Sequence, residues 1–161
     1  MATRIPLVVN AGQIQQLQTG DNIVTAAAQY DNEVFTNGES STALVIGAPV
    51  YVSAASTAKR AQANAASTAR VVGLWVDITT SASSSGNCAV GGRVTATTAQ
   101  WDAVAGTSGG LVANTVYYLD PANLGKLTAT APTTVGQLVV AVGLAFSSTD
   151  MDIIGAQPIL L

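Results

Sequence analysis

"ANTVYYLDPANLGKLTATAPTT", residues 113–134, repeats the pattern of an earlier stretch, "GAPVYVSAASTAKRAQANAAST", residues 47–68. The two stretches superpose without a gap, and the superposition places Val50 on Val116. After four extra residues in the second copy, the match continues from "VVGL" (71–74) to "AVGL" (141–144). Two copies that agree in alternation and turn length indicate that one supersecondary unit occurs twice.

The repeated unit is predicted to be strand, turn, strand, turn, strand. Its second strand alternates in both copies, because alternate residues of a strand point to opposite faces. In 126–131 the residues on one face are Leu127, Ala129 and Ala131, and in 60–65 they are Ala61, Ala63 and Ala65. Alanine buries little apolar area. The sheets are therefore expected to approach closely or to gain stability from another chain.

The segment "YYLDPANLGK" is interpreted as a turn between two strands. Asp120 and Pro121 are turn initiators, and Asn123 and Gly125 favour turn conformations. The first copy carries serine and alanine where the second carries the aspartate and proline, and no catalytic partner for Asp120 is apparent. A turn aspartate is therefore favoured over a catalytic carboxylate.

Short runs of β-branched residues between Gly, Asn, Asp, Pro and Ser indicate an all-β fold. We predict an antiparallel β-sandwich or barrel-like domain over residues 44–161, with its internal repeat at about 47–80 and 113–150. The run "QLVVAVGLAF" is too short to span a membrane and is predicted to be a buried strand.

Residues 1–43 are predicted to be an extended N-terminal arm and a connection. The arm contains two short candidate strands, "LVVN" and "GQIQQL". In the connection, "TAAAQYDNEVF" (25–35) is compatible with a short helix capped by Thr25, and Asn37 with Gly38 is a turn signal that favours positive φ.

Three further segments have local signals. "TTAQWDAVAGTSGGL" is predicted to include a helical turn capped by Thr98. "SASSSGN" (81–87) and "GTSGG" (106–110) are predicted to be exposed loops, because neither leads into a helix or carries the Lys-Ser/Thr pair of a phosphate-binding loop.

Charged residues make up only 9% of the chain, against about 25% in an average soluble protein. Scattered charge usually keeps proteins apart in solution. A surface this poor in charge suits a chain whose faces are covered by neighbouring subunits, although a small β-domain with a Ser/Thr-rich surface is an alternative.

Several function classes lack their usual residues. Six basic residues without a cluster argue against nucleic-acid binding, and the absence of histidine removes the commonest general base. The single cysteine, Cys88, cannot form an internal disulfide and is expected to be a small buried apolar group. We find no secretory signal and no membrane span, and expect no cofactor.

Two pairs of acidic residues lie at strand spacing, Asp150 with Asp152 and Asp31 with Glu33. Each pair could contribute to a calcium site, which needs six to eight oxygens, but a solvated strand edge or turn is favoured. The aromatic residues expected in the core or in an oligomer interface are Trp75, Trp101, Tyr117 and Tyr118.

Three stretches resemble small virion proteins of tailed bacteriophages, especially capsid decoration (cement) proteins and head-fibre or tail-fibre modules. They are "RIPLVVNAGQIQQLQTGD", the block from "TATTAQWDAV" to "KLTATAP", and "VGLAFSSTDMDI". The resemblance implies a β-rich, often trimeric protein on the outer capsid, where it resists the pressure of the packaged genome. The duplicated β unit and the arm depart from the simplest decoration proteins.

The expected function is that of a structural protein without enzymatic activity, located on the capsid exterior of the virion. Its expected partners are the major capsid protein and further copies of itself, as a homo-oligomer and by resemblance a trimer. The arm residues expected to contact the capsid are Arg4, Ile5, Leu7, Val8, Val9, Ile14 and Leu17. Alternatives are a head-fibre or tail-tip component that contacts the host surface, and a carbohydrate-binding or hydrolytic domain that uses Asp120, Asp150 or Asp152.

Overall fold

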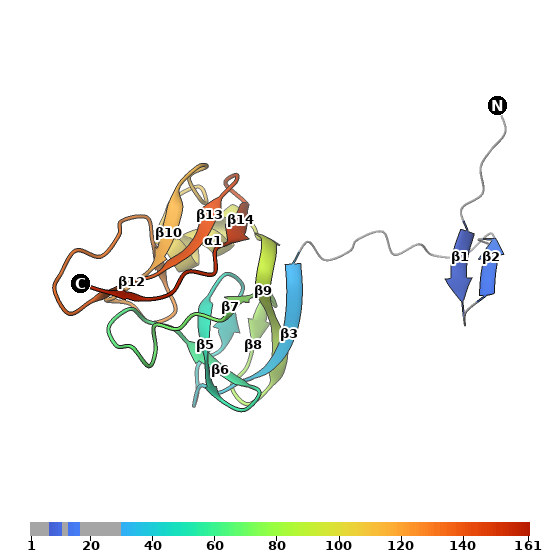
Figure 1. The fold of residues 1–161 in the computed structure, drawn as a ribbon, viewed down its shortest axis with the longest axis horizontal. Coiled ribbons are helices and arrows are strands. Elements are labelled where there is room, and N and C mark those ends of the chain that lie inside the picture. Colours follow the sequence, from blue (N-terminus) through green and yellow to red (C-terminus); the bar gives the residue numbers. More distant parts are fainter. Residues whose placement is uncertain (1–6, 11–12, 17–29) are drawn as a thin grey trace.

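The computed structural model describes residues 30–161 and, in the N-terminal region, the backbone of 7–10 and 13–16. The described part consists mainly of β-strands with one short helix, which confirms the all-β prediction (Figure 1). In the N-terminal region β1 (Leu7–Asn10) pairs antiparallel with β2 (Gln13–Gln16), as expected for the two short strands.

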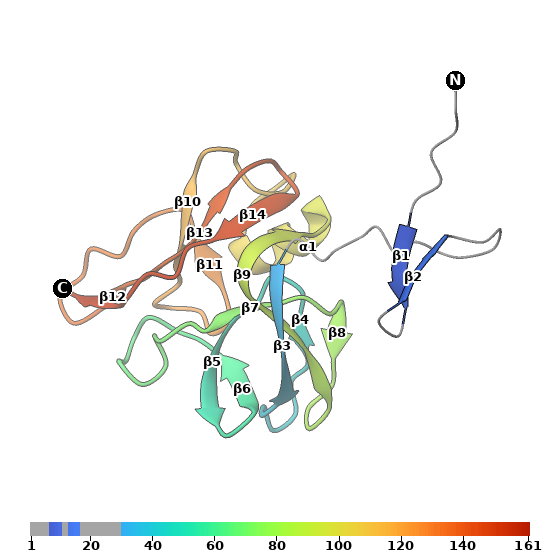
Figure 2. The same ribbon diagram turned by 45° about the vertical axis from the view of Figure 1, so that its right-hand side comes forward.

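Five strands form a closed ring, so the domain is barrel-like (Figure 2). The ring runs through β3 (Tyr30–Asn37), β6 (Thr57–Arg60), β5 (Pro49–Ala54), β7 (Gly73–Trp75) and β9 (Ser85–Thr95), and it closes where β7 pairs with β9. The pairing of β3 with β6 is parallel. The sheet is therefore mixed, and the expectation of a purely antiparallel fold was wrong at this contact.

The interior of the ring is filled by one large aromatic side chain and several small ones. Trp75 is fully buried there, and its indole Nε1 donates a hydrogen bond of 3.0 Å to the hydroxyl of Thr80. Cys88 is buried in the same cluster, as predicted, and burial raises the pKa of its thiol to about 12. The other buried members of the cluster are Leu44, Ala48, Val50 and Ala58.

A second, four-stranded sheet continues from the ring. Its order is β11 (Leu127–Thr128), β10 (Val116–Leu119), β13 (Ala141–Ala145) and β14 (Asp150–Ile153), and β14 pairs with the far end of β9. Two short antiparallel pairs complete the described fold: β4 (Leu44–Val45) with β8 (Thr79–Thr80), and β12 (Leu138–Val139) with β15 (Ile159–Leu160).

The one helix of the described residues, α1 (Thr98–Ala105), lies beside the second sheet (Figure 1). Its N-cap is Thr97, one residue before the predicted cap, and Thr97 forms a capping box with Gln100. Gly106 ends the helix in a left-handed conformation. Trp101 is fully buried, and its indole Nε1 donates a 2.8 Å hydrogen bond to the carbonyl of Thr149.

The repeated unit predicted from sequence is present as two equivalent arrangements of strands. In each, the first strand lies between the second and third: β5 between β6 and β7, and β10 between β11 and β13. Val50 pairs with Gly73, and Tyr117 pairs with Gly143. The structural counterpart of Val50 is therefore the equally buried Tyr117, one residue beyond the Val116 that the ungapped superposition selects.

The predicted alternating strands are shorter than expected. β6 ends at Arg60 and β11 ends at Thr128, so the strands expected over 60–65 and 126–131 were wrong beyond these residues. The backbone after β6 instead bonds to the second unit: Ala63 N–H donates to the carbonyl of Asp120 (3.2 Å), and Gly125 N–H donates to that of Ala61 (2.8 Å). The buried alanines Ala61 and Ala63 thus fill the junction between the units.

The predicted connection contains a strand of the ring. The short helix compatible with 25–35 is not present over 30–35, because Tyr30–Asn37 is β3, which pairs with β9. Thr25, its possible cap, lies outside the described residues. The sheet therefore begins before residue 44, the expected start of the β-domain.

Asn37 and Gly38 do not adopt the positive φ expected of a turn. Asn37 is fully buried, and its side-chain amide donates to the carbonyls of Thr42 (3.0 Å) and Thr80 (2.9 Å). The side-chain oxygen Oδ1 of Asn37 accepts a hydrogen bond from the N–H of Glu39 (3.0 Å). Asn37 thus ties the end of β3 to two neighbouring segments because its amide can donate and accept at once.

The segment 81–87, predicted to be an exposed loop, instead runs into the longest strand of the described fold, which begins at Ser85. Gly86 is buried against Trp75, and a Cβ on Gly86 would lie 2.5 Å from the indole ring. Glycine is needed here so that the tryptophan can pack against the backbone of β9.

The two glycines of the repeated "VGL" motif allow close approach of a neighbouring strand, which gives a graded stability prediction. A Cβ on Gly73 would overlap the carbonyl of Ala89 at 2.0 Å, whereas a Cβ on Gly143 would meet the side chain of Met151 at 2.5 Å and the carbonyl oxygen of Asp152 at 2.9 Å, a less severe backbone clash. We expect Gly73→Ala to lower the free energy of unfolding by about 3 kcal/mol or more and Gly143→Ala by about 1–3 kcal/mol, as measured by urea denaturation.

Gly155→Ala is the control, because no atom lies within 4 Å of the position of its Cβ and its φ is not positive. Its free energy of unfolding should stay within about 1 kcal/mol of wild type. Equal stability of all three variants would contradict the close approach of β7 to β9.

Candidate functional site

The residues predicted to contact a capsid fall only partly within the described structure. Arg4, Ile5 and Leu17 lie outside the described residues. Leu7, Val8, Val9 and Ile14 lie in the β1–β2 pair, where Val9 is opposite Ile14. By strand alternation, Leu7, Val9 and Ile14 occupy positions on one face of this pair, and Val8 occupies the other.

Three of the four aromatic residues predicted for the core or an oligomer interface lie in the core. Trp75, Trp101 and Tyr117 have no exposed surface. The hydroxyl of Tyr117 accepts a 3.0 Å hydrogen bond from the N–H of Val112, which satisfies its polar atom inside the fold. Tyr118, the next residue of β10, is half-buried.

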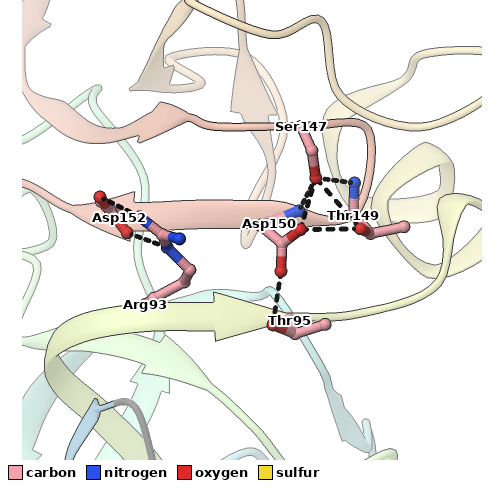
Figure 3. A network of polar contacts seen from close by, with 6 residues as sticks. All are labelled: Arg93, Thr95, Ser147, Thr149, Asp150 and Asp152. Atoms are coloured by element: carbon pink, nitrogen blue, oxygen red, sulfur yellow. Dashed lines mark hydrogen bonds and ion pairs between the residues drawn. The ribbon is translucent and has the colours of Figure 1, made fainter.

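The densest polar cluster lies where β9, β14 and the turn before β14 meet (Figure 3). The carboxylate of Asp150 accepts hydrogen bonds from the hydroxyls of Ser147, Thr95 (2.6 Å) and Thr149 (2.9 Å). The hydrogen bonds from Ser147 and Thr95, followed by that from Thr149, hold the pKa of Asp150 below its ordinary value despite some burial.

Asp152 is paired with Arg93 across the same two strands (Figure 3). The pair is bidentate, with Nε to Oδ1 at 2.7 Å and the terminal nitrogen to Oδ2 at 3.0 Å. These hydrogen bonds lower the pKa of Asp152 and raise that of Arg93. The guanidinium also stacks on the exposed ring of Phe146, 3.9 Å from its centroid, a cation–π contact.

The six residues of Figure 3 form a structural clasp, a set of hydrogen bonds and one ion pair that joins β9 to β14. Both aspartates are held in the ionised form, and their oxygens accept hydrogen bonds from within the chain. In residues 30–161 and the two short N-terminal segments, no group of three potential metal-ligating side chains occurs.

Two further aspartates organise loops. Asp120 accepts from the N–H groups of Ala122 (2.7 Å) and Asn123 (3.0 Å), which confirms the turn interpretation. Asp102 accepts hydrogen bonds from backbone N–H groups of the Gly-rich loop after α1 and from the hydroxyl of Thr107. These bonds fix the loop and lower the pKa of Asp102. The sequence reasoning did not find the role of Asp102, whose partners lie in the glycine-rich segment.

Two regions of the described surface carry neighbouring large apolar side chains. The first is a groove of two adjoining hollows, about 250 and 480 Å³ in volume, that share Ile46, Ile78 and Gln100, and no charged side chain lines it. The second is the β12–β15 pair with the turn before it, which exposes Val135, Ile159, Leu160 and Leu161. In the sequence, this second region is marked only by the lack of any charged residue between Leu127 and Thr149.

Comparison with known proteins gives no relative: the chain matches no family model, no curated protein and no solved structure. Among the described residues, the single helix is too short to be a candidate membrane span.

The ion pair between Asp152 and Arg93 predicts how the stability of the fold depends on pH. Because the pKa of Asp152 is lowered in the folded protein, the ionised carboxylate stabilises the fold above its unfolded pKa of about 3.9, and this contribution is lost as the pH falls through the lower folded value. We expect Asp152→Asn to reduce the free energy of unfolding at pH 7 by up to about 1 kcal/mol, since the pair is partly exposed.

The measurement is urea denaturation of wild type and Asp152→Asn between pH 7 and pH 2. The difference between the two proteins should shrink as the pH falls below 4. A difference that is constant over the whole range would show that the carboxylate charge does not contribute.

Proposed function

We propose that the chain is a structural virion protein of a tailed bacteriophage that binds the outer surface of the capsid and has no enzymatic activity. The observation that carries this proposal is the surface of the described domain: it exposes twelve large apolar side chains, while the whole chain is only 9% charged. Such a surface is typical of proteins that work in contact with other subunits. The resemblance of the three sequence stretches supplies the setting.

The N-terminal β1–β2 pair is the proposed capsid anchor. An isolated two-stranded pair is marginally stable in water, and Leu7, Val9 and Ile14 occupy one face of it by register. Docking that face onto another protein would bury these apolar residues and stabilise the pair. Strand addition to an open sheet edge is a second way in which such a segment binds.

The remaining domain is proposed to stand outward as a rigid body. Each of the five ring strands has a neighbouring strand on both sides, and no buried side-chain polar atom in the described residues lacks a hydrogen-bond partner. The polar clusters that a carbohydrate-binding or hydrolytic domain would use are occupied by internal hydrogen bonds. The resemblance implies a trimer, whereas the exposed edge of β15 favours a pair of chains.

Deletion of residues 1–20 tests the anchor. We expect the truncated protein to lose cosedimentation with purified capsids that lack this protein, because the apolar contact face is gone. Its circular dichroism spectrum and urea midpoint should stay close to those of the full chain, since the ring begins at Tyr30.

A matched pair of variants separates the apolar face from the mere presence of the arm. Replacing Leu7, Val9 and Ile14 with serine should weaken capsid binding at least about tenfold, the effect of losing roughly 1.4 kcal/mol. Replacing Asn10, Gln13 and Gln15 with serine should leave capsid binding unchanged, because these residues are on the opposite face by register. Unaltered binding after the first set of changes would contradict the proposed anchor.

The position of the protein on the particle decides between decoration and a fibre role. Antibody labelling of intact virions, viewed by electron microscopy, should mark the head surface at many sites. Labelling confined to the tail tip would replace the proposed capsid role with that of a fibre or tail-tip component.

A further inference from the structure

β15 is an open and apolar strand edge, whereas the outer edge of the second sheet is covered. The five-stranded ring is closed, and β11, at the outer edge of the second sheet, lies against α1, where Lys126 donates a hydrogen bond to the carbonyl of Ala103. β12 is covered on its far side, because Leu138 N–H donates to the carbonyl of Ala63 (3.0 Å). In the part of the chain that the structure describes, β15 pairs with β12 alone.

The backbone of Leu160 faces the open side of this edge. Leu161 N–H donates to the carbonyl of Gln137, so residue 161 bonds toward β12. Bonding direction alternates along an antiparallel strand, so the N–H and carbonyl of the preceding Leu160 point away from β12. The outward N–H of Leu138, which is opposite Leu160 in the register, agrees with this assignment.

The side chains along the edge are apolar and exposed. The exposed fractions are 64% for Ile159, 69% for Leu160 and 42% for Leu161, and the neighbouring Val135 is 86% exposed. An exposed apolar strand with unpaired backbone groups is a template for pairing with another chain. Proline is one of the devices that end such an edge, and Pro158 has no N–H to offer on the same side as Leu160.

We propose that β15 pairs antiparallel with β15 of a second copy of this chain, about a two-fold axis at Leu160. In this register Leu160 of each copy exchanges both backbone hydrogen bonds with its counterpart. Ile159 then lies opposite Leu161 of the other copy on each side of the axis. The three cross-strand pairs are therefore all apolar, and Pro158 lies just outside the paired segment.

Charge favours a second copy as the occupant. Residues 127–149 and 153–161 contain no charged side chain, so no like-charged side chains of these segments face each other when two identical edges meet. A two-fold contact of this kind closes on itself and forms a pair of chains.

The test is analytical ultracentrifugation of the purified full-length chain without capsids, so its outcome is independent of the proposed capsid attachment. Wild type should show a concentration-dependent shift from 16.2 kDa to twice that mass. Leu160→Lys should raise the dissociation constant at least about tenfold, because two like charges then face each other at the axis. Leu160→Glu should have the same effect.

A mixture of the two variants gives the sharpest readout. Leu160→Lys and Leu160→Glu should each be monomeric and should associate when mixed, because opposite charges then meet at the axis. The control is Ile78→Lys, an equally exposed apolar residue (72%) outside the β12–β15 pair, and it should associate like wild type.

Three results would overturn the proposal. They are a wild type that stays monomeric at all concentrations, an oligomer that Leu160→Lys leaves intact, and a trimer in place of the pair. Equal loss of association in Ile78→Lys would also count against it, because it would assign the contact to general surface apolarity.

Discussion

The pairing of β7 with β9 is the contact on which the rest of the fold depends. It places Leu74 opposite Ala89 and Trp75 opposite Cys88, and it closes the ring. The approach is possible because Gly73 has no Cβ, which would otherwise overlap the carbonyl of Ala89. β9 also carries the second sheet through β14, so one strand holds both halves of the domain together.

The closure of the ring affects which parts of the domain another molecule can contact. Each ring strand has a neighbour on both sides, and the buried side-chain polar atoms of the described residues all have hydrogen-bond partners. Apolar surface is exposed at the groove beside Ile46 and Ile78 and at the β12–β15 pair. Burial of such surface against another protein subunit is what the proposed structural role requires.

Signals contained within a short stretch of sequence were predictable. The repeated unit, the Asp120 turn and the capped helix each depend on residues close together in the chain, and each is present. β9 was not predictable, because Gly86, Gly91 and Gly92 suppress the strand signal. Gly86 leaves room for the ring of Trp75. In the sequence, this long-range packing requirement cannot be told from the glycine-rich composition of a loop. The turn predicted at Asn37 was wrong for a related reason. Asparagine is common in turns, but Asn37 is buried and its side chain hydrogen-bonds two neighbouring segments.

The clasp and the open edge were beyond sequence reasoning because both are set by distant partners. Arg93 and Asp152 are 59 positions apart, and the edge of β15 depends on β12, which lies about twenty residues earlier and is its one partner among the described strands. A two-residue edge gives a weak contact in dilute solution. If the arm holds copies at neighbouring sites on a particle, the same contact becomes effectively intramolecular, and a high local concentration strengthens it without any new interaction. A short, uncharged edge is then sufficient, because the array supplies the proximity that the edge itself lacks.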